Sequence, residues 1–179
     1  MNAETLKPGL AEQRLAIQAA LDFSDLAVRP EWCDPAGFLR TSFVSVIVDL
    51  AMQRVAREAW QVGWDHTETT GQSGFVVGCK VTCLRRLRAG DPVRFEFIVA
   101  DVDDKRNHVL TFLHHGTEGW LAATQELLNV CVDFTTRRTA VWHPSSRPVL
   151  DAFRAAQGNW PRPGHIGQPV GAVQVTNEV

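Results

Sequence analysis

The chain has 179 residues, of which 45% are hydrophobic, and its formal net charge at neutral pH is -2. This length provides one domain with a substantial core but is too short for two ordinary domains. The small net charge predicts no whole-protein attraction for nucleic acid. We therefore expect no nucleic-acid partner, and any anion binding must depend on local arginines.

The sequence carries no pattern for export or membrane insertion. Charged residues interrupt the first twenty positions, which leaves no apolar stretch for a secretory signal. The most apolar segment, residues 43–60, contains several charged side chains and is a poor membrane span. We expect a cytoplasmic protein with no membrane partner.

The four cysteines are expected to be reduced thiols, because their density is low and no secretory context supports disulfides. Cys79 and Cys83 fall within a predicted strand. In extended backbone they would lie roughly 13 Å apart, which is too far for both to bind one zinc ion. We therefore expect no metal site.

The first third of the chain predicts one long helix preceded by a turn. Residues 8–21 predict a short packing helix, and residues 23–29 predict an edge or first strand. A Pro- and Gly-containing turn over residues 33–38 follows. The helix itself is expected over 39–61, with Thr41 or Ser42 as its cap and Gly63 as its stop.

The middle of the chain predicts four strands after a polar loop at residues 64–73. The strands are expected at 75–87, 92–103, 108–115 and 120–136. Their connections are short and rich in turn residues, so successive strands should pair as an antiparallel meander.

The alternation within these strands predicts which side chains share a face. Phe75, Val77 and Cys79 should lie together, as should the set from Val93 to Val99 and the set from Leu128 to Phe134. A sheet with one buried face needs a cover. The helix over 39–61 is the available one.

The end of the chain predicts a short helix at 144–157 and then an extended or disordered arm at 158–179, which is rich in Gly and Pro. The expected organisation is therefore an N-terminal extension (1–21), one domain (22–157) and the arm.

Residues 33–37, with the sequence CDPAG, resemble the signature of 4-hydroxybenzoyl-CoA thioesterase-type hot-dog proteins. The second half is similar to betainyl-CoA thioesterases, in the AGDP stretch at 89–92, the DKR stretch at 104–106 and the LHHG stretch at 113–116. The resemblance covers roughly residues 26–154. It implies an α+β hot-dog fold, in which a curved antiparallel sheet wraps around the long helix.

The resemblance also implies an activity and partners. The expected reaction is the hydrolysis of an acyl-CoA thioester by a homodimer or a dimer of dimers. Coenzyme A would enter as part of the substrate, with no separate cofactor. Many relatives carry a histidine where this chain has Phe38, although the benzoyl-type enzymes also lack it.

Asp34 is the residue that the resemblance makes catalytic. It would attack the thioester carbonyl or act as general base on water, and the sequence leaves both routes open. The turn at Gly37 leads to the free N–H groups around Thr41, which would stabilise the developing oxyanion by about 3 kcal/mol. The alternative is that Asp34 is simply a turn residue.

Other carboxylates are weaker candidates. Glu126 is in phase with Leu128 and Val130, so it is expected on the apolar face of its strand, either as a catalytic group or in a structural ion pair. Asp49 and Glu58 lie on the long helix and are rivals to Asp34. Asp49, the better rival, is expected to be solvated or paired with Arg54, and Glu58 is expected to pair with Arg54.

Arginines at strand ends and turns are candidates for the phosphates of CoA. They are Arg85, Arg86, Arg88 and Arg106. Arg137, Arg138 and one lysine, Lys105, are further candidates. Trp32 is a candidate cation–π partner for a trimethylammonium acyl group, or a packing residue. The three histidines at 108, 114 and 115 are expected to be structural.

Two further functions remain open at this stage. A non-catalytic acyl-CoA binding module would have lost its catalytic groups, and Phe38 keeps that reading available. A 3-hydroxyacyl thioester dehydratase would require an Asp/His pair, which Phe38 argues against.

Overall fold

The computed structural model describes residues 9–160 and 162–170. Its elements follow the chain in this order: α1 (Leu10–Ala19), a 3₁₀ helix (Pro30–Trp32), α2 (Thr41–Glu58), α3 (Trp64–Thr70), β1 (Gln72–Cys83), β2 (Val93–Val102), β3 (Arg106–His115), β4 (Leu121–Asp133), β5 (Arg138–Thr139) and α4 (Arg147–Gln157). Within these ranges, no helix is long and apolar enough to cross a membrane.

The sheet has the strand order β1-β4-β3-β2, with β5 beside β4, and every pairing is antiparallel. The predicted meander is therefore correct for β2, β3 and β4. It is wrong for β1, which pairs with β4 instead of β2. The connection after β1 bonds to the N-terminal region rather than closing a hairpin: Leu39 N–H donates to Leu87, and Gly90 N–H donates to Val28.

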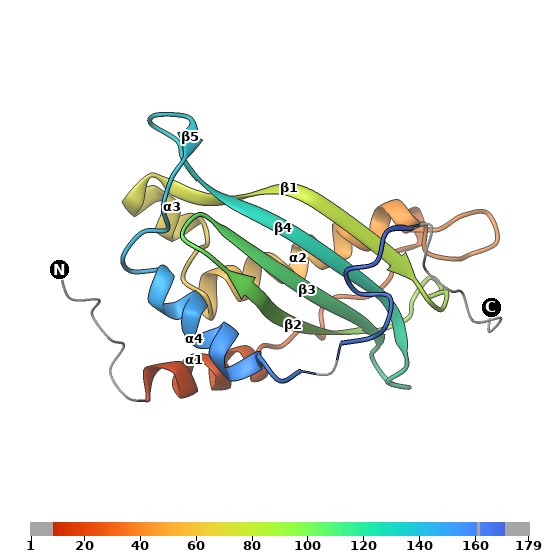
Figure 1. Cartoon of the computed structure of the whole chain (residues 1–179). Helices are drawn as coiled ribbons and strands as arrows, with labels where there is room; N and C mark the ends of the chain where they lie inside the picture. The colour runs from red at the N-terminus through yellow and green to blue at the C-terminus, as the bar shows by residue number, and fades with distance from the viewer. Residues whose placement is uncertain (1–8, 161, 171–179) are drawn as a thin grey trace.

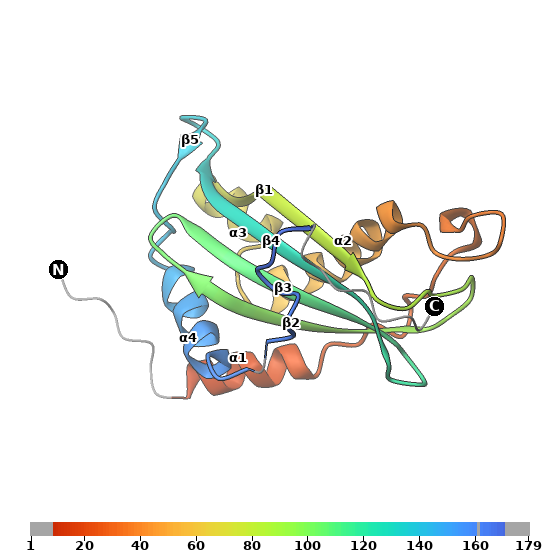
Figure 2. The same ribbon diagram turned by 45° about the vertical axis from the view of Figure 1, so that its right-hand side comes forward.

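The sheet curves around α2, which lies across its inner face (Figures 1 and 2). The buried side chains of α2 recur at helical spacing and include Val44, Ile47, Val48, Ala51 and Val55. The predicted inward face of β2, from Val93 to Val99, packs into the same core. The α+β class with one long central helix is confirmed.

The ends of α2 differ from the prediction. Arg40 is the N-cap and uses no side-chain hydrogen bond, so neither Thr41 nor Ser42 caps the helix. The helix ends at Glu58, well before Gly63. That glycine instead precedes α3, which occupies the predicted loop. A Cβ on Gly63 would stand 2.8 Å from the Cα of Arg57, so this close packing of two helices requires glycine.

Residues 23–29 do not form the predicted strand. Only Ala27 makes an isolated bridge, to Pro92. The segment nevertheless packs inward, because Leu26 and Val28 are buried. The predicted terminal helices are both present, as α1 and α4, with slightly shorter bounds.

A β-bulge changes which side chains of β1 face α2. The register shifts between Val76 and Gly78, so Phe75 and Cys79 lie on opposite faces, contrary to the prediction. The predicted inward set of β4 is also on the wrong side. Leu127 and Cys131 belong to the core around α2, and Leu128 and its in-phase neighbours therefore lie on the outer face.

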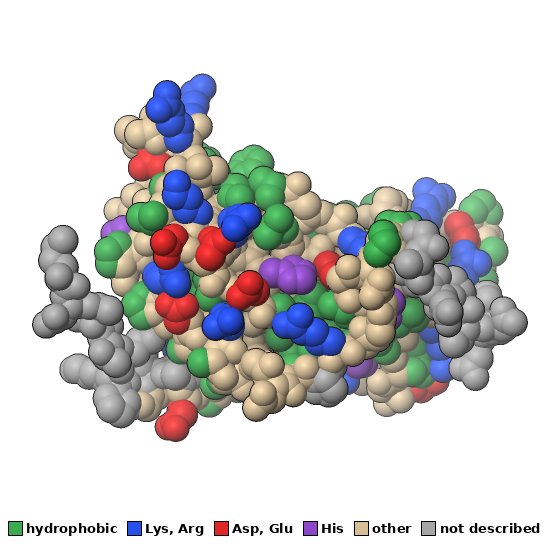
Figure 3. Space-filling model, viewed as in Figure 1, with side chains coloured by type: hydrophobic (Ala, Val, Ile, Leu, Met, Phe, Trp, Pro, Cys, Tyr) green, Lys and Arg blue, Asp and Glu red, His purple; other side chains and the backbone are tan. Residues whose placement is uncertain are grey.

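The chain's own C-terminal segment crosses the outer face of the sheet (Figures 1 and 2, dark blue). Ile98, Leu110 and Phe112 form a second apolar cluster there, against which Trp160 and Ile166 pack. Figure 3 views this face, where charged, histidine and hydrophobic side chains are mixed. Residues 162–170 contain no helix or strand longer than a turn, and the rest of the predicted arm, residues 161 and 171–179, lies outside the described ranges.

Candidate active site

The Asp34 carboxylate is held by the turn that contains it. Its Oδ1 accepts hydrogen bonds from the N–H groups of Ala36 at 2.9 Å and Phe38 at 3.0 Å. Gly37, at φ +82°, lets the chain reverse so that the backbone of Asp34 also bonds to Phe38. The turn is thus an Asx turn whose geometry fixes the side chain.

An arginine completes the surroundings of this carboxylate. Arg86 Nη2 lies 2.5 Å from Asp34 Oδ2. The backbone N–H groups of Phe38 and Ala36, together with the charge of Arg86, hold the pKa of Asp34 below its usual value. Asp34 is therefore a carboxylate at neutral pH, and its side chain is 27% exposed.

Two arginines stack on the ring of Phe38, which follows the Asp34 turn. The guanidinium carbon of Arg86 is 4.1 Å from the ring centroid, and that of Arg88 is 4.3 Å away. These are cation–π distances. Phe38 therefore gathers positive charge next to Asp34.

The start of α2 is open to solvent. Thr41 and Ser42 are exposed, and among the described residues their backbone N–H groups find no acceptor. Arg40, the N-cap, is anchored by its N–H to Trp32 at 3.1 Å. Unpaired N–H groups at a helix start attract negative charge, which the helix dipole reinforces.

A cleft of about 140 Å³ connects these features. Thr41 lines it from α2, Cys83 from the end of β1, and Arg85 and Arg86 from the following connection. The Cys83 thiol lies 3.6 Å from the Thr41 hydroxyl. The cleft thus joins the open helix start to the arginine that holds Asp34.

A larger cavity of about 460 Å³ continues along α2. It begins at Ser45, one helical turn (about 6 Å) beyond Thr41. On the sheet side it begins at Cys79, four residues before Cys83 on the same face of β1. The two spaces therefore follow one seam between α2 and β1.

Glu126 lies away from this seam, on the outer face of the sheet. Its Oε1 is 2.7 Å from Lys80 Nζ, and its Oε2 accepts from the N–H of Gly167 at 2.9 Å. Lys80 also donates to the backbone oxygens of His165 and Gln168. The predicted position on the face toward the helix is therefore wrong, and Glu126 holds the C-terminal segment against the sheet.

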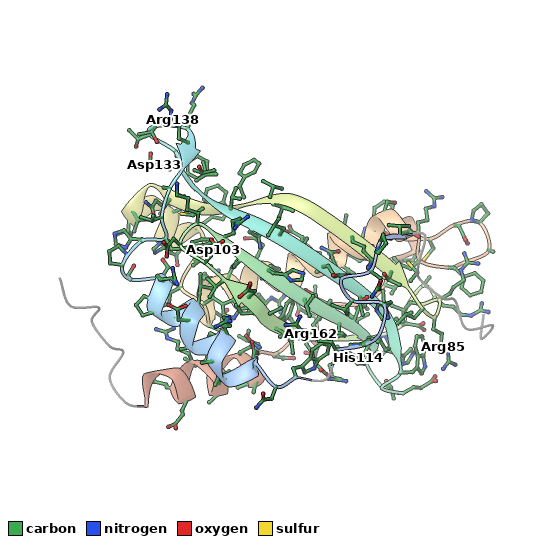
Figure 4. All side chains as sticks on the ribbon, in the orientation of Figure 1. Arg85, Asp103, His114, Asp133, Arg138 and Arg162 are labelled. Atoms are coloured by element: carbon green, nitrogen blue, oxygen red, sulfur yellow. The ribbon has the colours of Figure 1, made fainter. Side chains whose placement is uncertain are left out.

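The arginines predicted to bind CoA divide between the two ends of the sheet. Arg85, Arg86 and Arg88 lie beside the Asp34 turn, where the first two line the cleft. Arg106 pairs with Asp103 at the opposite end of β3. Figure 4 shows the separation, with Arg85 at one end of the molecule and Asp103 and Arg138 towards the other.

The carboxylates predicted on α2 have different partners from those expected. Arg54 pairs with Asp25 and also donates to the carbonyl of Asp22 at 2.8 Å. Glu58 pairs with Arg57 at 3.0 Å. Asp49 faces the large cavity, where the Gln53 amide is its only side-chain hydrogen-bond donor among the described residues.

Trp32 is buried, with its ring stacked on Phe43 at a centroid distance of 6.2 Å and Arg29 over it. It therefore packs within the protein and is not part of the cavity wall. The cavity contains other indole rings instead, those of Trp60, Trp64 and Trp142.

The three neighbouring histidines each have local partners. His115 Nδ1 accepts from the N–H groups of Thr117 and Glu118, and His114 Nδ1 lies 3.2 Å from the Gly119 carbonyl. His108 faces Glu126 at 3.8 Å. In the described part of the chain, no group of three or more His, Cys, Asp or Glu side chains could hold a metal, and all four cysteines are free.

Sequence reasoning missed the residues that line the floor of the large cavity, notably Gln125, Asn129 and Trp142. One signal was available. Polar amides at 125 and 129 alternate in phase with Leu127, a pattern that is unusual for a strand face packed on a helix.

The matches to known proteins are as follows. Residues 28–153 match the family model of the thioesterase-like superfamily. A hypothetical protein from Staphylococcus aureus, solved in complex with CoA, is 21% identical, with a TM-score of 0.75 over 81% of this chain and 90% of that one. No curated protein matches.

Two further solved structures are similar in fold. A DHNA-CoA thioesterase from Staphylococcus aureus is 14% identical, with a TM-score of 0.66 over 74% of this chain and 89% of that one. A thioesterase from Thermus thermophilus, complexed with coenzyme A and Zn, is 19% identical, with a TM-score of 0.60 over 73% and 92%. At these identities the likeness shows a shared fold, the hot-dog arrangement expected from the sequence.

Proposed function

Because the chain belongs to the thioesterase-like superfamily, we propose that it hydrolyses an acyl-CoA thioester to a free acid and CoA. The observation that supports this most directly is an ionised carboxylate, Asp34, whose partner Arg86 lines a cleft together with an open helix start. A thioester bound in that cleft would meet the N–H donors of the helix start, and Asp34 would be next to it, through its ion pair with Arg86.

In the proposed reaction the Asp34 carboxylate attacks the thioester carbon and expels CoA as the thiolate. Water then hydrolyses the mixed anhydride and restores the carboxylate. Alternatively, Asp34 accepts a proton from the water that attacks. Its lowered pKa keeps the carboxyl group ionised at neutral pH, as both routes require.

The N–H groups of Thr41 and Ser42 are proposed as the oxyanion donors. They are free and exposed, and the dipole of the eighteen-residue helix α2 supports them. A donor of this kind stabilises a transition state by about 3 kcal/mol. Arg85 and Arg88 are proposed to bind the CoA phosphates, and the reaction needs no cofactor beyond the CoA of the substrate.

A second candidate function is acyl-CoA binding without catalysis. The observation that favours it is that both oxygens of Asp34 already have partners, as in a purely structural turn. The dehydratase function finds no support at this site, because Phe38 provides no proton-transfer group.

Release of free thiol from a panel of acyl-CoAs tests the proposal, with the wild type and Asp34→Asn compared. Asparagine retains the oxygen that accepts the two turn N–H bonds but removes the charge. We expect turnover by the wild type and a large loss in the variant. Equal turnover by both would eliminate Asp34 as the catalytic group, and binding of CoA without turnover would favour the binding module.

Turnover in H₂¹⁸O separates the two routes of hydrolysis. If Asp34 is the nucleophile and water opens the anhydride at the aspartyl carbon, ¹⁸O enters the Asp34 side chain, which mass spectrometry of the peptide detects. If Asp34 is a general base, the label appears only in the released acid.

We further propose that the protein is a homodimer joined through β1. The larger assembly expected from the sequence, a dimer of dimers, would pair two of these units. At the other edge, the side chains of Gln18 and Gln157 bond to the backbone of β2 at Phe97 and Val99, which blocks strand pairing. The β1 edge exposes Phe75, Val76 and Val77 instead.

Light scattering at micromolar concentration tests the dimer. Val76→Lys, on the exposed edge, should give a monomer, and Val141→Lys, at a similarly exposed valine outside the edge, should not. A monomeric wild type would contradict the proposal.

A further inference from the structure

The large cavity along α2 has a polar floor, which is unexpected for a space that would hold a plain alkyl chain. Gln125 and Asn129 of β4 and Asn107 of β3 line it from the sheet. Asn129 Nδ2 donates to Asn107 Oδ1 at 2.9 Å, so these two amides are partly satisfied by each other. Both strands present these side chains on the face toward α2.

Gln125 is different because its side-chain oxygen has no partner. The residue is only 4% exposed, and its Oε1 is buried without a hydrogen bond to any described residue. Thr111, directly opposite on β3, is 0% exposed and its hydroxyl is also unpartnered. Buried polar groups without partners are destabilising and uncommon in native proteins.

A second unpartnered group lines the same cavity. The indole N–H of Trp142 is buried without an acceptor among the described residues, and this residue is 6% exposed. The residues that line the cavity therefore carry buried, unpaired groups of both kinds, a carbonyl oxygen that requires a donor and an N–H that requires an acceptor.

The wall on the α2 side is amphipathic in the same way. Val48, Met52 and Ala56 supply apolar surface, while Ser45, Asp49 and Gln53 supply polar atoms. The cavity begins one turn beyond Thr41, and Gln125 lies two residues beyond Ala123, which lines the smaller cleft. A group bound at Gln125 is thus about 7 Å further along the sheet than the cleft.

We propose that this cavity binds an acyl group that carries a hydroxyl several carbons from the thioester, with Gln125 as its hydrogen-bond acceptor. A hydroxyl both donates and accepts, so it can satisfy a group of either kind, whereas a methyl group can satisfy neither. This inference rests on the proposed thioesterase function and adds the substrate class.

The test compares 6-hydroxyhexanoyl-CoA with heptanoyl-CoA, which has the same number of heavy atoms in its acyl chain. We expect the wild type to favour the hydroxylated substrate by about tenfold in kcat/KM, as for one buried neutral hydrogen bond. 3-Hydroxyhexanoyl-CoA, whose hydroxyl lies too near the thioester to reach Gln125, should not share the preference.

Gln125→Leu removes the amide at similar volume, and the preference should fall to about one. Gln13→Leu makes the same change at an exposed position of α1 and should leave the preference intact. If Gln125→Leu does not fold, the test uses Gln125→Met instead. The ratio of kcat/KM for 6-hydroxyhexanoyl-CoA to that for heptanoyl-CoA is then compared between this variant and the wild type. A wild-type preference for heptanoyl-CoA, or a ratio unaffected by Gln125→Leu, would overturn the inference.

A binding measurement separates failure of this inference from failure of the proposed thioesterase function. If no acyl-CoA is hydrolysed, calorimetric dissociation constants for the same two substrates replace kcat/KM, and a tenfold tighter binding of the hydroxylated one would still support the cavity's specificity. Equal binding constants in that case would reject it.

Discussion

Asp34 and Asp103 occupy turns that bind their carboxylates in the same way, at opposite ends of the sheet. Asp103 Oδ1 accepts from the N–H groups of Lys105 and Arg106, and its Oδ2 from the Arg106 side chain at 2.8 Å. Asp34 uses two backbone N–H groups and Arg86 likewise. The pKa of each carboxyl lies below its usual value.

The surroundings of the two turns are different. The Asp103 turn joins β2 to β3 and leaves its side chain 47% exposed. The Asp34 turn precedes the open start of α2, and Arg86 connects it to the cleft. A fixed, ionised aspartate is therefore a common structural device, and its neighbours decide whether it can act in chemistry.

The strongest test of this comparison is the pair Asp34→Asn and Asp103→Asn. Both variants keep the turn oxygen and lose the charge. We expect Asp34→Asn to lower kcat by roughly 10²- to 10⁴-fold, the range for a catalytic acid–base group, and Asp103→Asn to stay within about twofold. Thiol release measures kcat, and thermal unfolding checks that both are folded. Similar losses in both variants would mean that general destabilisation explains the effect.

The arginine partners provide the next test. Arg86→Ala removes the cation beside Asp34 and one wall of the cleft, so kcat/KM for an acyl-CoA should fall by about 10- to 100-fold, as for one hydrogen bond to a charged group. Arg106→Ala removes the equivalent partner of Asp103 and should have little effect. A loss of activity in Arg106→Ala would place CoA binding at the other end of the sheet.

The sequence predicted the fold well because its strongest signals are local. The apolar spacing of α2 and the alternation in β2 both reflect burial against one core, and the structure confirms them. Strand order is a long-range property. The partner of β1 depends on where residues 84–92 find hydrogen-bond acceptors, which no local pattern encodes.

The site was predictable only through its turn. The resemblance at residues 33–37 pointed to Asp34, but the side chain that pairs with it, Arg86, lies 52 positions away. Glu126 lies on the face opposite to the predicted one, because the outer face, which the C-terminal segment covers, also carries apolar side chains. A strand with apolar residues on both faces has no clear inward phase.

Two glycines extend the comparison to the backbone. Gly37 and Gly90 have φ of +82° and +90°, and a Cβ at either would meet nothing within 4 Å. Alanine should therefore cost about 1–2 kcal/mol at each, from the left-handed backbone alone. Only Gly37→Ala should also lower kcat, by about tenfold, because a shifted turn moves Asp34. Chemical denaturation and thiol release measure the two effects, and equal activity in both variants would contradict a positioning role for Gly37.

The smallest expected effect is the pH dependence of stability. A carboxyl whose pKa is lowered by folding binds fewer protons in the folded state than in the unfolded state, so it stabilises the protein above its unfolded pKa. For Asp103 this contribution should be complete above pH 3.8 and disappear as the pH falls to about 2. The Tm difference between the wild type and Asp103→Asn should therefore shrink below pH 3.8.

Asp34→Asn should behave in the same direction, since the two carboxylates share their hydrogen-bond pattern. If the Tm difference for either variant were constant from pH 7 to pH 2.5, that carboxylate would not be ionised and bonded in the folded protein. For Asp34, that result would remove the ionised group on which both proposed routes of hydrolysis depend.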